Sequence, residues 1–206
     1  MKKNVKKIFI FLRPILDNLF NFNSGTKKII ILLFFLLSHK TSYAEPEAIA
    51  ALQEGEKLVF IRHAMAPGGG DPENFKLNDC STQRNLDSAG ISQAKKIGQF
   101  FKDNNIQIDK VLSSEWCRTK DTAQNAFGKY KTFNALNSFF SSKFSQNREK
   151  QMKDLKVFVD NWDSKKNIVF VTHYVVILEA LNTTVDSGEI IVADKNYKVI
   201  GTIETN

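Results

Sequence analysis

The sequence predicts an α/β fold: a three-layer α/β/α sandwich around a mainly parallel sheet, with an antiparallel strand at one edge. Short apolar runs of the kind that form buried parallel strands alternate along the chain with longer segments whose apolar residues repeat at helical spacing. The last two apolar segments are separated only by a tight turn at residues 194–196, which favours an antiparallel pair at an edge of the sheet.

The strands are predicted from apolar runs that turn-forming residues interrupt. Segments 57–61 and 167–171 are the most continuous of these runs, as expected for strands that are covered on both faces. Shorter runs complete the sheet. In chain order, we expect strands at residues 57–61, 110–113, 131–133, 167–171, 189–193 and 197–203.

The helices are predicted from helical spacing and from end signals. Asp87 or Ser88 can cap a helix that ends near Asn104, and Gly128 closes another. The glycine-rich segment 66–72 breaks regular structure, and the aromatic-rich segment 137–144 is a loop or a short helix. In chain order, we expect helices at residues 46–53, 88–104, 114–127, 148–162 and 174–181.

The first 44 residues are predicted to be a signal peptide that is removed after Ala44. Basic residues open the chain, a nine-residue apolar run spans residues 29–37, and Ser42 and Ala44 place small residues at the positions that a signal peptidase inspects. The alternative is an uncleaved anchor, but a spanning helix needs about 20 apolar residues. We therefore expect a periplasmic or secreted protein without a stable membrane anchor, whose residues 45–206 form a single domain.

The charge distribution argues against a nucleic-acid partner. The chain has 29 basic and 22 acidic side chains, a net charge of +7. Residues 1–44 contain eight of the basic side chains and one of the acidic ones, so that residues 45–206 carry 21 of each. The basic excess therefore belongs to the predicted signal peptide, and the remaining domain has no basic surplus that would attract nucleic acid.

Two cysteines, Cys80 and Cys117, lie in the predicted exported domain. A pair of cysteines in an oxidising compartment favours a disulfide. The alternative is two separate free thiols, one of them buried, and the spacing alone does not decide between the two.

Polar residues follow three of the predicted strands. Arg62 and His63 follow the first strand, Arg118 lies one helical turn after the second, and His173 follows the fourth. For either histidine alone, packing in a loop is the simpler interpretation. Ligands of parallel sheets bind beyond the carboxyl ends of the strands, however, so that the four residues together indicate one site.

Such a cluster suits phosphoryl transfer. Two guanidinium groups can hold a phosphate or carboxylate through paired hydrogen bonds. A neutral imidazole can attack phosphorus, and fixed positive charge stabilises the transferring phosphoryl group. Two distant histidines without a further ligand pair make a poor zinc site, so we expect no metal and no other cofactor.

At these residues the sequence resembles the histidine phosphatase superfamily, which has the phosphoglycerate mutase-like fold. That family has a strand followed by Arg-His, then a strand with Ser-Ser and a following Arg, then a strand that ends in His. The corresponding segments here are Leu58–Ala64, Leu112–Ala123 and Val169–His173, in the same order. The chain is most similar to small exported members, a group that includes the phosphatase of lipopolysaccharide core heptose phosphate.

The resemblance implies a metal-independent, histidine acid-type phosphomonoester hydrolase acting on a small phosphorylated envelope or periplasmic substrate. It implies that His63 is the phosphorylated nucleophile and that Arg62, Arg118 and His173 bind the phosphoryl group. The Glu that serves as acid in the mutase-like branch has no counterpart near residues 136–138. Asp71, Glu73 and Asp79 are candidate general acids because they lie in the loop after His63, although each is also readily interpreted as a loop charge or a turn cap.

The missing acid keeps a second hypothesis open, a catalytically weak or inactive module that binds a phosphorylated or carboxylated ligand on the same fold. A mutase is a weaker third option, because this short exported chain has no evident segment that would cover a bound bisphosphate.

Arg84 is interpreted as an ordinary surface charge, with a further phosphate ligand as the alternative. No feature of the sequence specifies an oligomeric state.

Overall fold

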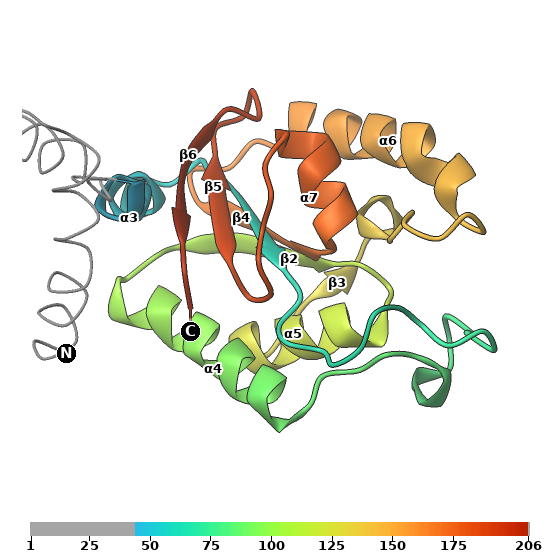
Figure 1. Cartoon of the computed structure of the whole chain (residues 1–206). Helices are drawn as coiled ribbons and strands as arrows, with labels where there is room; N and C mark the ends of the chain where they lie inside the picture. The colour runs from blue at the N-terminus through green and yellow to red at the C-terminus, as the bar shows by residue number, and fades with distance from the viewer. Residues whose placement is uncertain (1–43, 206) are drawn as a thin grey trace, which may run out of the picture. The chain divides into compact units, whose positions relative to one another are not determined.

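In the computed structural model, which describes residues 44–205, six strands form one mixed sheet in the order β3-β2-β4-β1-β5-β6 (Figure 1). The predicted signal peptide lies outside the described residues except for Ala44. β1 pairs with β4, β4 with β2 and β2 with β3 in parallel, whereas β5 and β6 add an antiparallel edge. The predicted fold class is therefore confirmed. The strands are β1 (Leu58–Arg62), β2 (Ile108–Ser113), β3 (Lys131–Thr132), β4 (Asn167–Thr172), β5 (Ile190–Ala193) and β6 (Val199–Ile203).

Helices cover both faces of this sheet because the side chains of a strand point alternately to opposite sides. Leu58 and Phe60 of β1 pack with helices α6 and α7, and Val59 and Ile61 pack with α3, α4 and α5. None of the described helices is long and apolar enough to cross a bilayer. The helices are α3 (Ala44–Glu54), α4 (Ser88–Asp103), α5 (Cys117–Phe127), α6 (Arg148–Asp160) and α7 (Tyr174–Leu181).

Several helix and strand ends differ by a few residues from the predictions, and two of these differences have clear local reasons. α5 begins at Cys117 rather than at residue 114, because the amide of Ser114 still bonds the carbonyl of Val171 and Trp116 is extended. β6 begins at Val199 rather than at 197, because Tyr197 has a φ of +63° in the preceding turn. Segment 137–144 is a loop, one of its two predicted alternatives, and short 3₁₀ turns at Asn134–Leu136 and Ser145–Asn147 flank it.

α4 and α5 pack closely where Gly98 of α4 lies against Ala126, in the last turn of α5. A Cβ atom on Gly98 would lie 2.0 Å from the carbonyl oxygen of Ala126, so no larger residue fits there without a shift of one helix. The asparagine at the opposite end of the sheet has a similar fixing role, since the Asn167 side chain bonds the backbone of Lys57, Leu52 and Gln107. The first contact joins α4 to α5, and the second joins the start of β4 to α3 and to the residues that precede β1 and β2.

Candidate active site

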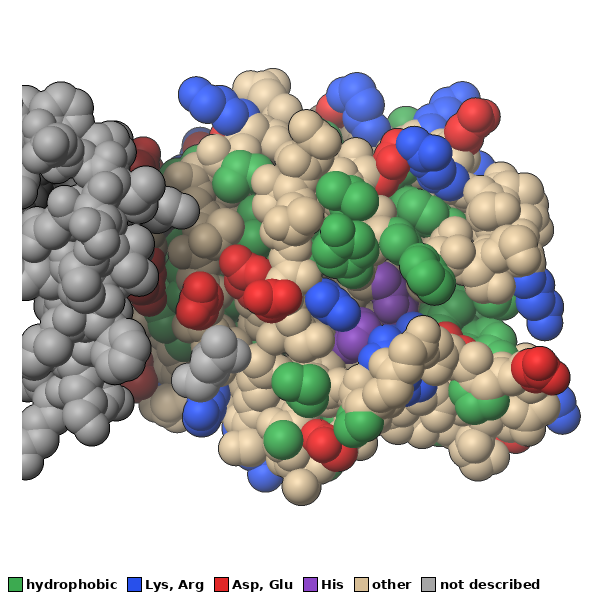
Figure 2. Space-filling view, in the orientation of Figure 1, with side chains coloured by type: hydrophobic (Ala, Val, Ile, Leu, Met, Phe, Trp, Pro, Cys, Tyr) green, Lys and Arg blue, Asp and Glu red, His purple; other side chains and the backbone are tan. Residues whose placement is uncertain are grey.

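Four polar side chains from separate parts of the chain meet at the carboxyl ends of β1, β2 and β4. Arg62 ends β1 and His63 follows it, His173 follows β4, and Arg118 lies in the first turn of α5. Because the strand order is β2-β4-β1, these ends are neighbours. All four residues line one cavity of about 500 Å³. Figure 2 shows the histidines in a depression bordered by basic and hydrophobic side chains.

His63 is held in an orientation that suits a nucleophile. Only 2% of the residue is exposed, and its Nδ1 lies 2.8 Å from the carbonyl oxygen of Ala64. A carbonyl only accepts hydrogen bonds, so Nδ1 carries the proton and Nε2 of the neutral ring keeps its lone pair. The backbone amide of His63 donates to Thr172 at the end of β4, which fixes the residue between the two central strands.

Both histidines remain neutral over the ordinary pH range. Burial lowers the pKa of His63 to about 3, and the positive charge of Arg118 adds to this effect. Burial likewise places the pKa of His173 well below its ordinary value, again with a contribution from Arg118. A neutral imidazole is the form that can attack phosphorus, so the nucleophile needs no base to activate it.

The ring of His173 is fixed by its neighbours. Its Nε2 lies 2.8 Å from the hydroxyl of Ser114, which in turn donates to Asn137. The Trp116 ring packs edge-on against the imidazole at 5.3 Å between centroids. The centroids of the His173 and His63 rings are 5.6 Å apart, so both imidazoles face the same small volume.

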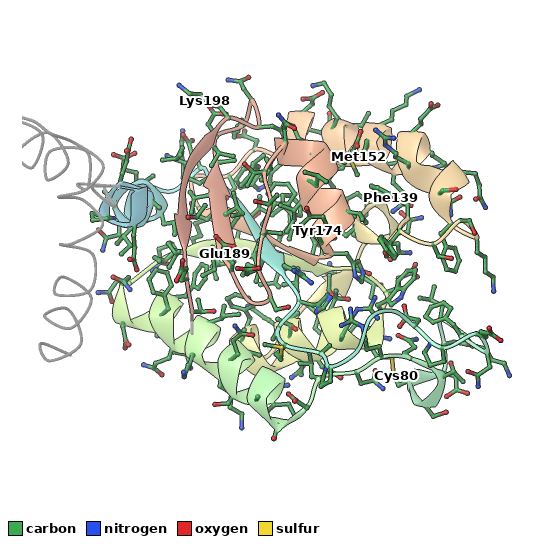
Figure 3. All side chains as sticks on the ribbon, in the orientation of Figure 1. Cys80, Phe139, Met152, Tyr174, Glu189 and Lys198 are labelled. Atoms are coloured by element: carbon green, nitrogen blue, oxygen red, sulfur yellow. A yellow bond between two sulfur atoms is a disulfide. The ribbon has the colours of Figure 1, made fainter. Side chains whose placement is uncertain are left out.

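Arg62 and Arg118 are positioned by different partners. The Nη1 of Arg62 donates to the carbonyl of Val185 at 2.9 Å, and its guanidinium lies over the ring of Tyr174. Figure 3 labels Tyr174 at the start of α7. Arg118 is 4% exposed and binds both carboxylate oxygens of Asp71 through Nη1 and Nη2, at 2.7 and 3.3 Å.

Asp71 therefore lies in the cavity as the counterion of Arg118. It also accepts hydrogen bonds from the indole of Trp116 and from the amide of Arg84. Burial opposes its charge, but the hydrogen bond and the charge of Arg118 outweigh burial, and the pKa of Asp71 lies below its ordinary value. A carboxylate that stays ionised has no proton to donate, so this geometry does not suit a general acid.

The other two candidate acids lie elsewhere. Glu73 lines the rim of the cavity and is exposed. Asp79 is not among the lining residues; it caps a 3₁₀ turn at Cys80–Thr82 by accepting from the amide and the hydroxyl of Ser81. The interpretation of Asp79 as a turn cap, rather than as an acid, is the one that the structure supports.

A disulfide joins Cys80 to Cys117, so the alternative of two free thiols does not apply (Figure 3). The bond ties the loop after β1 to the residue just before Arg118. The same loop carries Arg84, which lines the cavity. The interpretation of Arg84 as a surface charge is therefore wrong, because the loop folds back over the strand ends and turns the side chain inward.

An aromatic wall adjoins the polar floor of the cavity. The rings of Phe75, Trp116 and Phe144 contact one another at 5.2 to 5.8 Å between centroids. Phe140, on the same rim, is 75% exposed. Within residues 44–205, no group of three or more His, Cys, Asp or Glu side chains could hold a metal ion.

The depressed histidine pKa values predict a pH dependence of stability. The unfolded chain binds a proton at His63 near the reference pKa of 6.5, whereas the folded chain does so only near 3. The unfolded state therefore holds more protons between these values, and the free energy of unfolding rises with pH across this window. Each histidine contributes a slope of at most about 1.4 kcal/mol per pH unit.

Urea denaturation between about pH 4 and about pH 7 measures this slope. The His63→Asn variant removes one of the two titrating rings and should show a shallower rise than the wild-type protein. Asp71 contributes with the same sign in both proteins, so the comparison isolates the histidine. An equal slope in both proteins would contradict the assignment.

Comparison with known proteins bears on the family resemblance and on the fold. The sequence profile described as the histidine phosphatase superfamily (branch 1) matches residues 58–135, which include the first two motifs, and the predicted resemblance is confirmed. No curated protein matches the chain significantly.

Solved structures share the fold at low sequence identity. A putative alpha-ribazole-5'-P phosphatase from Escherichia coli is 17% identical with a TM-score of 0.52, covering 71% of this chain and 96% of its own. The protein histidine phosphatase SixA, complexed with tungstate, is 12% identical with a TM-score of 0.52, covering 72% and 97%. The product of an open reading frame of Mycobacterium tuberculosis is 15% identical with a TM-score of 0.52, covering 73% and 96%.

Proposed function

Because this chain carries the signature residues and the fold of the histidine phosphatase superfamily, we propose that it is a metal-independent phosphomonoester hydrolase that works through a phosphohistidine at His63. The observation that carries the proposal is the tautomer of His63. Its Nδ1–H is bound to the carbonyl of Ala64, which leaves the Nε2 lone pair facing a cavity lined by arginines.

The reaction takes place in two displacements. In the first, Nε2 of His63 attacks phosphorus as the bond to the leaving oxygen breaks, and the guanidinium groups of Arg62 and Arg118 balance the charge of the phosphoryl oxygens. In the second, water attacks the phosphohistidine, the P–N bond breaks, and inorganic phosphate leaves with neutral His63 restored. The leaving group takes its proton from water, because Asp71 is bound to Arg118.

The substrate is a small phosphorylated compound of the cell envelope or the periplasm. The arginines of the cavity can hold a phosphoryl group, and the wall of Phe75, Trp116 and Phe144 offers an apolar surface for the leaving group. The predicted signal peptide and the disulfide support action in the periplasm or outside the cell, since disulfides persist in oxidising compartments.

Release of phosphate from p-nitrophenyl phosphate in the presence of a chelator tests the proposal. We expect turnover by the protein without its first 44 residues, and we expect the chelator to leave the rate unchanged. Loss of the activity on chelation would overturn the metal-independent mechanism.

Because Asp71 is bound to Arg118 and cannot act as a general acid, we predict that the rate of hydrolysis depends strongly on the leaving group. A general acid contributes roughly 10²- to 10⁴-fold to the expulsion of a poor leaving group and little to that of a good one. We therefore expect kcat/KM for an aryl phosphate such as p-nitrophenyl phosphate to exceed that for a simple alkyl phosphate by at least about 100-fold. Because kcat/KM reports the first displacement, a slow second step does not mask the difference.

Two matched variants sharpen this measurement. Neither Asp71→Asn nor Glu73→Gln should change the ratio of aryl to alkyl activity, whatever they do to the absolute rates. If Glu73→Gln lowered only the activity on the alkyl phosphate, Glu73 would be the acid and the expectation would be wrong.

The bidentate pairing of Asp71 with Arg118 also favours one alternative, a binding module with little or no turnover. An internal carboxylate on the central arginine lowers the attraction for phosphate and leaves the site without an acid. Such a module would bind inorganic phosphate but release none from p-nitrophenyl phosphate. Measuring both in the same preparation separates the two functions.

A further inference from the structure

Three arginines, rather than two, surround the cavity. Arg62, Arg84 and Arg118 all line it. In each of them the Nε atom is buried and has no hydrogen-bond partner. A buried donor without a partner is costly, and most such groups in folded proteins are satisfied. Three of the five buried, unpartnered side-chain atoms found among the described residues therefore belong to the guanidinium groups of this one cavity.

Arg84 reaches the cavity from the loop between β1 and α4. Its Nη1 donates to the carbonyls of Ala66 and Gly68, so one side of the guanidinium is fixed to the loop. Its backbone amide donates to Asp71, and its carbonyl oxygen accepts from Nη1 of Arg118. The residue is thus connected through its main chain to the Asp71–Arg118 pair, while its side chain keeps donors without partners.

The disulfide holds this arrangement together. Cys80 lies four residues before Arg84, and its partner Cys117 lies just before Arg118. The side chain of Gln83 also accepts from the amide of Cys117 at 2.9 Å. Two independent contacts therefore fix the segment that carries Arg84 against the segment that carries Arg118.

The charged side chains of the cavity do not balance one another. The three guanidinium groups are positive, Asp71 is negative, and both histidines are neutral, which gives the floor a net charge of +2. Glu73 and Lys143, of opposite sign, lie at the rim. Burial lowers the pKa of Arg84, and the nearby charges of Arg118 and Arg62 lower it further while Asp71 opposes them. Without Arg84 the floor would carry only +1.

We propose that Arg84 is a third phosphoryl-binding residue, which together with Arg62 and Arg118 matches the site to the doubly charged form of a phosphate group. The inference rests on the proposed function and adds to it a preference for dianions. A phosphate dianion would balance the excess charge of the cavity floor, whereas a monoanion would leave a positive charge uncompensated.

Binding of inorganic phosphate, followed by calorimetry at about pH 5 and about pH 8, tests the proposal, because phosphate groups pass from the singly to the doubly charged form between these values. Wild-type protein should bind more tightly at the higher pH. At that pH, Arg84→Gln should weaken binding by roughly 10- to 100-fold, the effect expected for loss of a charge-assisted hydrogen bond. At the lower pH, the same substitution should cost much less. Arg84→Lys should retain part of the preference for the dianion.

Comparing phosphate affinity at the two pH values distinguishes direct binding of phosphate by Arg84 from a role of Arg84 in holding the loop between β1 and α4 in place. If Arg84 only held the loop in place, Arg84→Gln would weaken binding equally at both values, and that outcome overturns the proposal. Arg148→Gln is the matched control, because Arg148 is exposed and pairs with Glu179 away from the cavity. Unchanged binding in Arg84→Gln, in a protein that hydrolyses p-nitrophenyl phosphate, would refute the role of Arg84 and leave the proposed function standing. A wild-type protein that neither binds phosphate nor hydrolyses the ester would refute both.

Discussion

The His63→Ala variant is expected to release phosphate from p-nitrophenyl phosphate at least about 10⁴-fold more slowly than the wild-type protein, because it lacks the nucleophile of the proposed covalent intermediate. His173 is the only other imidazole of the described residues, and its Nε2 already contacts the hydroxyl of Ser114. Initial rates at saturating substrate measure the loss.

Trapping the intermediate identifies the reacting atom directly. Wild-type protein mixed with a ³²P-labelled phosphodonor and quenched should retain label in an acid-labile, alkali-stable bond, as a phosphoramidate does. The His63→Ala protein should retain none while keeping its circular dichroism spectrum. Turnover near the wild-type rate in this variant, or label on another residue, would exclude the mechanism.

Arg118→Ala is expected to lower kcat/KM by roughly 10²- to 10³-fold, equivalent to about 3 to 4 kcal/mol of transition-state stabilisation. The guanidinium is 4% exposed and lies in the first turn of α5, where it can contact the oxygens of the transferring group. Its removal also leaves Asp71 as an unpaired negative charge beside the incoming phosphate. Both effects act against an anionic transition state.

Two further variants separate these effects. Arg118→Ala combined with Asp71→Asn removes the unpaired carboxylate, so the double variant should recover part of the loss. Arg148→Ala removes an exposed arginine of the same type and should leave kcat/KM within about twofold of wild type, as for most surface changes. If the Arg118→Ala and Arg148→Ala proteins were equally active, Arg118 would have no part in phosphoryl binding.

The sequence was sufficient to predict which polar residues lie at the carboxyl ends of the strands. His63 and His173 directly follow apolar runs, and the alternation of strands and helices brings such ends to one edge of a parallel sheet. The apolar run before each histidine is a local feature of the sequence. It is enough to place the histidine at the carboxyl end of a strand. The positions of Arg62 and Arg118 follow from the same regularity.

The loop residues could not be placed in this way. Asp71 and Arg84 lie in a segment with little regular structure, and their positions depend on long-range contacts with Trp116 and Arg118. The pair of cysteines was the one available signal. The disulfide between Cys80 and Cys117, which the sequence favours, places Arg84 four residues from a cysteine that is bonded to the neighbour of Arg118.

The cavity is assembled from two kinds of chain segment, with consequences for how such a protein can diversify. The groups that we propose to contact phosphorus or its oxygens lie mainly at the ends of the central strands, where a shift of one residue would disrupt the sheet. The wall beside them comes from the loops around residues 68–75 and 138–144, which contain only short pieces of regular structure. Insertions or exchanges in these loops could change which alcohol is accepted while the phosphoryl-transfer machinery stays intact, so relatives with the same strand ends need not share a substrate.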